Sequence, residues 1–199
     1  MTRTRIYLVR HGQVVGHEER RYNGQGDVPL TAAGEAQFGL LQLRLADKPL
    51  AAVYCSDLQR TLVGARVLAQ PFALQPVALA DLRELHIGDW EGMTWQELQS
   101  RYPQQWQARL DDIVHYRVPG GENLIDLAGR VLPAIRAIVE RHQGEDVVVV
   151  AHGGVNRVIL LDAIGAPLER LFHIEQDFGC LNTIDYFADG NRVVRLLNG

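Results

Sequence analysis

The feature that most constrains the fold is an apolar strand that ends abruptly at an arginine, a histidine and a glycine. The run Ile6-Tyr7-Leu8-Val9 is followed directly by Arg10-His11-Gly12. A continuous apolar run of this kind is typical of a parallel strand that is covered on both faces. Because open α/β sheets bind ligands at the carboxyl ends of their strands, we expect His11 to lie at a functional edge.

Arg10 and Gly12 both suit such an edge. The guanidinium of Arg10 is a planar cation that fits a phosphate or a carboxylate better than a metal. Gly12 lacks a Cβ, so the chain can turn sharply and let a substrate approach the backbone. The triplet alone is also compatible with a hydrogen-bonded structural histidine, so by itself it does not establish catalysis.

The same pattern recurs in the second half of the chain. The apolar run 146–151 is followed by His152-Gly153-Gly154, and a helix-like segment extends from Val155 to Ile164. If the two strands are parallel neighbours, both imidazoles lie at one edge of the sheet, within reach of one bound group. The two runs together predict a functional site at that edge.

The remaining segments predict alternating helices and strands. Thr31 is placed to cap one helix and Ser56 another, and Thr94 and Glu97 form a capping-box pattern. Alternating runs on either side of Asp189-Gly190 are typical of a β-hairpin. The expected helices are 32–46, 57–70, one from Thr94 onward and 123–142, and the expected further strands are 51–55, 75–79, 182–188 and 191–197.

Composition and length bound the class of protein. The chain has 199 residues, 47% of them hydrophobic, and no Pro/Gly/Ser-rich linker divides it, so we expect one domain over residues 1–199. The net charge is −4 and no basic stripe is present, so we expect no nucleic-acid partner. The run Ile6–Val9 is too short for a signal-peptide core or a membrane span, so we expect a cytoplasmic protein without membrane attachment.

Cys55 and Cys180 have no metal-type partners nearby, and we expect both to be small buried hydrophobes.

Arg60 is unusual for its position. It falls in the first turn of the expected helix 57–70, where a cation opposes the helix dipole. An anion bound at the sheet edge would compensate for this cost. A salt bridge to Asp57, one turn earlier, is the alternative explanation.

Two further segments are compatible with more than one role. The loop 82–92 is rich in acidic residues. Spacing alone does not decide which of Glu84, Asp89 and Glu91 would take part in the chemistry of the site. Residues 95–118 are rich in aromatic side chains, which form either a satellite core or a substrate wall. A wall would favour a leaving group that contains a ring.

Taken together, four motifs resemble the histidine phosphatase superfamily, the phosphoglycerate-mutase-like proteins. The motifs are residues 8–12, 56–61, 83–92 and 151–154. Residues 21–31 and 119–122 resemble the branch that contains α-ribazole phosphatases and small broad-specificity phosphatases. This resemblance implies an α/β three-layer sandwich with a mostly parallel central sheet flanked by helices, a C-terminal β-hairpin, and residues 93–121 as a helical cap.

The resemblance also implies a mechanism of phosphoryl transfer. His11 would be the nucleophile that forms phosphohistidine, and it must be neutral to attack. Arg10, Arg60 and a protonated His152 would hold the phosphate oxygens. Glu84, selected among the acids by the family pattern, would protonate the leaving oxygen and later accept a proton from water.

Other positions are expected to bind the substrate. Members of the family commonly have an asparagine six residues after the nucleophile, and His17 occupies that position here. This difference puts phosphate affinity and pH dependence in question, and Asn23 is expected to compensate in part. The full expected substrate-binding set is Arg10, His17, Asn23, Gly24, Arg60, His152 and Gly153.

The expected activity is therefore hydrolysis of a small phosphorylated metabolite, with α-ribazole 5′-phosphate as one candidate. No His₃, HExxH or clustered-aspartate motif is present in the sequence, so we expect no metal and no cofactor. A cofactor-dependent phosphoglycerate mutase is the main alternative, and an inactive binding module that keeps the fold is another. Monomer and homodimer both remain open.

Overall fold

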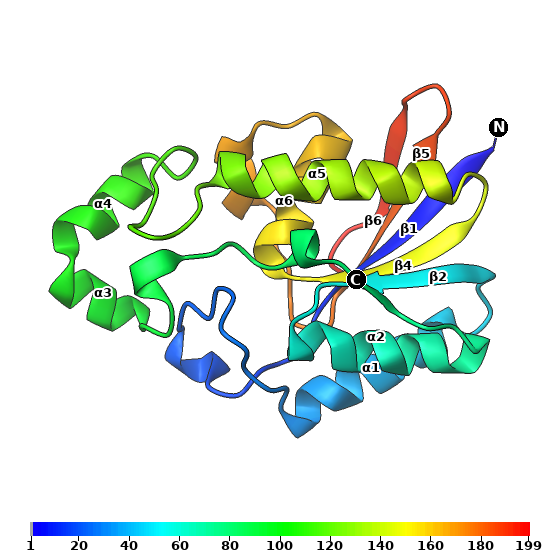
Figure 1. Ribbon diagram of the computed structural model, residues 1–199, viewed down its shortest axis with the longest axis horizontal. Helices are drawn as coiled ribbons and strands as arrows, with labels where there is room; N and C mark the ends of the chain where they lie inside the picture. Colours follow the sequence, from blue (N-terminus) through cyan, green and yellow to red (C-terminus); the bar gives the residue numbers. More distant parts are fainter. Residues whose placement is uncertain (1) are drawn as a thin grey trace.

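A six-stranded sheet runs through the middle of the molecule in the computed structural model, which describes residues 2–199 (Figure 1). The strand order is β3-β2-β4-β1-β5-β6. The pairings among β1, β2, β3 and β4 are parallel, whereas β5 pairs antiparallel with β1 and β6. The strands are β1 Arg3–Arg10, β2 Leu50–Cys55, β3 Val77–Ala78, β4 Asp146–Ala151, β5 Leu181–Phe187 and β6 Arg192–Leu196.

Helices cover both faces of this sheet, which confirms the predicted three-layer sandwich. Helices α1 (Ala32–Leu45) and α2 (Gln59–Ala69) pack on one face, and α5 (Leu124–Arg141) and α6 (Gly153–Ile164) pack on the other (Figure 1). Alternate residues of the central strands enter the two cores, so that nothing in β4 is exposed. This two-sided burial explains why the strand sequences are apolar without alternation.

Two short helices, α3 (Trp95–Arg101) and α4 (Pro103–Asp111), lie at one end of the molecule, beyond the sheet (Figure 1). The capping box predicted at Thr94 and Glu97 is formed. Short 3₁₀ turns complete the connections: η1 His17–Glu19, η2 Gln70–Phe72, η3 Ala80–Leu82, η4 Gly88–Trp90 and η5 Leu168–His173.

Most aromatic side chains near these helices pack against one another. The rings of Trp90 and Trp106 stack with centroids 6.1 Å apart, and Tyr22 and Tyr116 contact the same group. Trp90 is fully buried, whereas 40% of Trp95 is exposed. The aromatic segment is therefore mainly a satellite core, with Trp95 at its open edge.

Several local predictions are confirmed. The C-terminal hairpin forms between β5 and β6, and Thr31 caps α1 by accepting a hydrogen bond from the Gly34 amide. Cys55 and Cys180 are both buried as free thiols. Among residues 2–199, no helix combines the length and the hydropathy that a bilayer span requires.

Two local predictions are wrong. The strand expected at 75–79 is reduced to the two residues of β3. Helix α2 starts at Gln59, and Ser56 does not cap it, because the Ser56 hydroxyl contacts the His152 ring instead. Gly12 has a further, structural reason to lack a Cβ, since a Cβ there would lie 2.3 Å from the carbonyl oxygen of Gly34 at the start of α1.

Candidate active site

The two histidines predicted to share a sheet edge do so. Strands β1 and β4 pair in parallel with Arg10 opposite Ala151, and the His11 amide continues the ladder to the carbonyl oxygen of Ala151. Both strands therefore end at the same level. The ring centroids of His11 and His152 lie 5.2 Å apart.

A cavity of about 350 Å³ opens at this edge. It extends from the ends of the strands to the short helices α3 and α4, which contribute Trp95 and Arg109 to its wall. His152 is fully buried behind this wall and does not line the cavity. The other residues expected from the sequence do line it: Arg10, His11, His17, Asn23, Gly24, Arg60, Glu84 and Gly153.

His11 is held as a neutral imidazole. Its Nδ1 lies 2.8 Å from the Gly12 carbonyl oxygen, which can only accept, so Nδ1 carries the proton and Nε2 keeps a free lone pair. Burial lowers the pKa of His11 well below its usual value, and the charges of Arg10 and Arg60 lower it further. The ring is thus uncharged at neutral pH, as a nucleophile requires.

His152 is also neutral, contrary to the expectation of a protonated donor. Burial lowers its pKa well below the usual value, with Arg60 as the next cause. Its Nδ1 accepts a hydrogen bond of 3.3 Å from Arg60 Nε, and its Nε2 lies 2.7 Å from the Ser56 hydroxyl. Both ring nitrogens are engaged with the protein, so the positive charge of the site is carried by arginines.

Arg60 is buried without a carboxylate partner. Its two terminal nitrogens donate to the carbonyl oxygens of Gly24 and Gly26, each at 2.7 Å. The alternative salt bridge to Asp57 is not formed, because Asp57 pairs with Arg83. Arg60 thus ties the loop after β1 to the start of α2, and its charge remains available to an anion.

Arg10 has a donor without a partner. One terminal nitrogen donates to the Gln176 carbonyl oxygen, and the guanidinium carbon lies 4.0 Å from the ring centroid of Phe178. Its Nε is buried, and no group of residues 2–199 accepts a hydrogen bond from it. Arg10 nevertheless lines the cavity, so its guanidinium charge is available to an anion bound there.

Glu84 lies against the start of α6. One carboxylate oxygen accepts from the Gly154 amide at 3.0 Å, and the other accepts from the Leu85 amide at 2.8 Å. A Cβ on residue 154 would lie 2.5 Å from Oε1 of Glu84. Glycine after His152 and Gly153 is therefore what lets this carboxylate reach the edge of the cavity.

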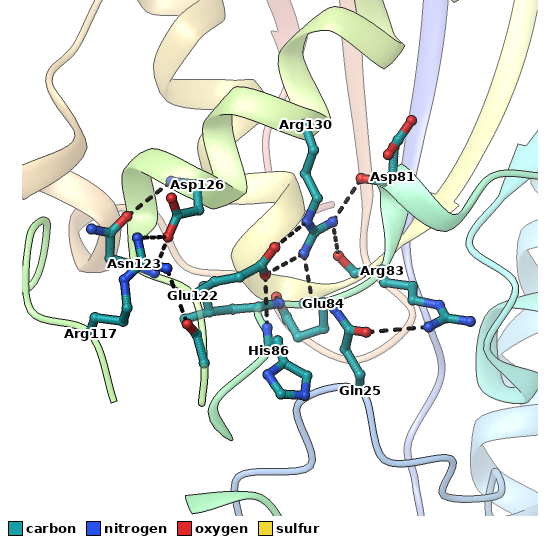
Figure 2. A network of polar contacts seen from close by, with 12 residues as sticks. Gln25, Asp81, Arg83, Glu84, His86, Arg117, Glu122, Asn123, Asp126 and Arg130 are labelled. Atoms are coloured by element: carbon teal, nitrogen blue, oxygen red, sulfur yellow. Dashed lines mark hydrogen bonds and ion pairs between the residues drawn. The ribbon is translucent and has the colours of Figure 1, made fainter. Parts of the chain in front are cut away.

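Arg130 of α5 holds the segment that carries Glu84 (Figure 2). Its guanidinium donates to the carbonyl oxygens of Asp81, Arg83 and Glu84, and it pairs with Glu122 at 2.7 Å. The second oxygen of Glu122 accepts from the His86 amide. Four backbone groups between Asp81 and His86 are thus held by Arg130 of α5 and by Glu122, which precedes that helix.

Comparison with known proteins identifies the family. The sequence model of the histidine phosphatase superfamily, branch 1, matches residues 6–199. The chain belongs to this superfamily.

Relatives and solved structures agree with this membership. The chain is 36% identical over 198 residues to a bifunctional protein of Mycobacterium tuberculosis, covering 99% of this chain but 54% of that protein. It thus spans about half the length of that relative. It is 30% identical over 181 residues to the adenosylcobalamin/α-ribazole phosphatase of Escherichia coli, covering 91% of this chain and 89% of that one.

The fold also matches solved structures of histidine phosphatases. The crystal structure of the α-ribazole phosphatase from Shigella flexneri superimposes with a TM-score of 0.90 at 30% identity, covering 98% of this chain and 96% of that one. The likeness therefore covers nearly the whole chain.

Sequence reasoning missed several residues of this histidine phosphatase site. Phe178 and Gln176 contact Arg10 from a segment without periodicity, and no local pattern marks them. Arg130 and Arg109 sit on helices, where an arginine is usually a solvated surface residue. Arg157, four residues after Gly153, also lines the cavity. Its position near the start of the helix that follows His152 is the sequence feature that could have predicted this.

Removing the Arg130 side chain should destabilise the protein. We expect Arg130→Met to lower the free energy of unfolding by about 2 kcal/mol, because Glu122 and three carbonyl oxygens lose their partner in a mostly buried site. Urea denaturation measures this loss. Arg117→Met is the matched control, since the pair of Arg117 with Asp126 is largely exposed and worth less than about 1 kcal/mol. Equal losses in the two variants would contradict the anchoring role of Arg130.

Proposed function

We propose that this protein is a phosphatase that hydrolyses a small phosphomonoester through a phosphohistidine on His11. One observation carries the proposal: a neutral imidazole with a free Nε2 lies in a cavity wall beside Arg10, whose buried Nε has no partner in the described chain. A nucleophile without charge next to unused positive donors is what attack on a phosphate dianion needs.

In the first step, Nε2 of His11 attacks phosphorus, and the bond from phosphorus to the leaving oxygen breaks. The acid form of Glu84 gives its proton to that oxygen, and the alcohol departs. Arg10 and Arg60 neutralise the non-bridging oxygens throughout.

In the second step, a water molecule attacks phosphorus and the bond to His11 breaks. Glu84 accepts a proton from this water, which restores its acid form, and inorganic phosphate leaves. His152 acts here through Arg60: its Nδ1 accepts from Arg60 Nε and fixes the plane of that guanidinium. His17, Asn23, Gly24 and Gly153 complete the wall around the phosphate.

The leaving group would occupy the part of the cavity nearest α3. Tyr22 and Trp95 line it there, with centroids 6.1 Å apart, and aromatic faces favour a leaving group that contains a ring. α-Ribazole 5′-phosphate is one candidate, supported by the names of the E. coli and S. flexneri relatives. A phosphoglycerate mutase is not favoured by these relatives, and an inactive module would not be expected to keep all five catalytic positions.

Replacing His11 should abolish hydrolysis. We expect His11→Ala to lower turnover of a phosphomonoester by at least about 10³-fold, because the covalent route is lost. Wild type, quenched with acid after exposure to ³²P-labelled substrate, should carry acid-labile and alkali-stable label, and the variant should not. His115→Ala, at an exposed histidine, is the control. Substantial turnover by His11→Ala would show that another group is the nucleophile.

Activity should survive removal of divalent metals. The cations of Arg10 and Arg60 supply the charge that a metal would otherwise supply. After exhaustive dialysis against EDTA, we expect turnover to stay within about twofold of the untreated enzyme. A loss that magnesium or zinc restores would refute metal-independent catalysis.

A panel of phosphomonoesters tests the leaving group. We expect kcat/KM for α-ribazole 5′-phosphate to exceed that for 3-phosphoglycerate by at least about tenfold, since a three-carbon acid cannot stack on Tyr22 and Trp95. Assaying both phosphate release and formation of 2-phosphoglycerate separates hydrolysis from isomerisation. A preference for phosphoglycerates would argue against the aromatic wall.

A further inference from the structure

Asn182 is a fully buried asparagine in strand β5. It pairs with Leu8 of β1, close to the sheet edge at which the cavity opens. Asparagine is uncommon in strands, and a buried amide costs free energy unless its hydrogen-bonding groups find partners. The presence of Asn182 in the centre of the fold therefore requires a specific set of partners.

The side-chain amide of Asn182 uses its full capacity for hydrogen bonds. Its Nδ2 donates to the carbonyl oxygen of Leu8 at 3.1 Å and to Oε1 of Gln176 at 2.8 Å. Its Oδ1 accepts from Nε2 of Gln176 at 2.8 Å and from the main-chain amide of Asn198 at 2.9 Å. Both donors and both lone pairs of the amide are thus satisfied. Asn182 and Gln176 form a reciprocal pair of amide hydrogen bonds.

The segment 176–178, between η5 and β5, holds the guanidinium of Arg10. It contains no helix and no strand. Nη1 of Arg10 donates to the main-chain carbonyl oxygen of Gln176, and the ring centroid of Phe178 lies 4.0 Å from the guanidinium carbon. The Phe178 ring also lies 5.6 Å from the ring of His11. The orientation of the Arg10 guanidinium therefore depends on where this segment lies.

Side-chain hydrogen bonds fix the segment 176–178 to the rest of the fold. The Gln176 side chain is buried, and so is its reciprocal pair with Asn182. One residue later, the Asp177 main-chain amide donates to Oδ1 of Asn198, but this contact is exposed to solvent. Because hydrogen bonds are electrostatically stronger in a buried site, the amide pair is the firmer of these two attachments.

The amide pair refers both ends of the Arg10 side chain to the same strand. The backbone of Arg10 ends β1, and Asn182 is bonded to the carbonyl oxygen of Leu8, two residues earlier in β1. Asn182 holds Gln176, and Gln176 holds the guanidinium. Charged groups contribute most to phosphoryl transfer when their geometry is fixed before the substrate binds. This connection supplies such a fixed geometry.

We infer that Asn182 and Gln176 are positioning residues, whose reciprocal amide pair fixes the Arg10 guanidinium in the orientation that a bound phosphate needs. Neither residue is among the described residues that line the cavity, so both act through Arg10. The kinetic consequence of the inference rests on the proposed phosphatase function. Binding of inorganic phosphate tests the same geometry without turnover.

Replacing Gln176 with methionine tests the inference. Methionine has a similar length and volume but no amide, and the main-chain carbonyl that accepts from Arg10 is kept. We expect Gln176→Met to weaken binding of inorganic phosphate, measured by isothermal titration calorimetry, by at least about tenfold, because a small displacement of a positioning group is costly. The value of kcat/KM for p-nitrophenyl phosphate should fall by at least the same factor. Asn182→Leu, which removes the other half of the pair, should give similar losses.

Thr4→Val is the matched control. Thr4 lies near the other end of β1, only 3% of it is exposed, and its hydroxyl donates to the carbonyl oxygen of His142 at 2.8 Å. Removing this hydroxyl lowers stability without moving Arg10, so phosphate affinity and kcat/KM should stay within about twofold of wild type. Urea denaturation of all variants shows whether a loss of affinity exceeds what a loss of stability alone produces.

A double-mutant cycle separates positioning from a general structural effect. In Arg10→Ala no guanidinium remains to be misplaced, so adding Gln176→Met should change the dissociation constant of inorganic phosphate by less than about twofold. A ³¹P NMR titration measures these weaker constants. A further loss of about tenfold in the Arg10→Ala background would show that the pair does not act through Arg10, and would overturn the inference.

The remaining outcomes distinguish the two proposals. If wild type hydrolyses no phosphomonoester, the proposed function fails, and phosphate binding by Gln176→Met still decides the positioning role. If Gln176→Met and Asn182→Leu both bind phosphate as tightly as wild type, the positioning role is overturned while the phosphatase function stands. Failure of wild type to bind inorganic phosphate overturns both. Gln176→Asn, whose amide is one methylene too short to reach Asn182, carries the test if the other two variants do not fold.

Discussion

The parallel pairing of β1 with β4 is the interaction on which the site depends. It fixes Arg10 opposite Ala151, so that His11 and His152 emerge at the same level of the sheet. A slip of one residue would turn every side chain of a strand to the opposite face and move apolar residues out of the two cores. The same burial that stabilises the sheet therefore sets the separation of the two imidazoles.

Burial also determines the charge state of the site. Removing His11 and His152 from water lowers the pKa of each, and the nearby arginines act in the same direction. Arginine remains charged under the same conditions, because its unperturbed pKa is far higher. The site thus combines neutral imidazoles with permanently positive guanidinium groups, so that histidine supplies the uncharged groups and arginine supplies the positive charge. A lysine in place of Arg10 or Arg60 would titrate more readily and would lose the planar donor geometry.

The sequence predicts well what depends on local pattern. The apolar runs identify β1 and β4, and short-range hydroxyl signals identify the caps at Thr31 and Thr94. It fails where the partner is remote: Ser56 looks like a helix cap, but its hydroxyl contacts a ring 96 residues away. The charge of His152 is missed for the same reason, since it depends on burial against Arg60. Arg130 and Arg109 look like ordinary helix surface residues until the fold shows what surrounds them.

The two halves of the cavity are built under different constraints. At the sheet edge, backbone geometry places His11, and Arg10 follows from the end of the same strand, so this half tolerates little variation. At the other end, the wall comes from α3, α4 and the loop at Tyr22, which contribute nothing to the central sheet. Because this half of the wall is not part of the sheet, we expect substitutions there to change which leaving groups the cavity accepts without disturbing the strand ends that carry His11 and His152.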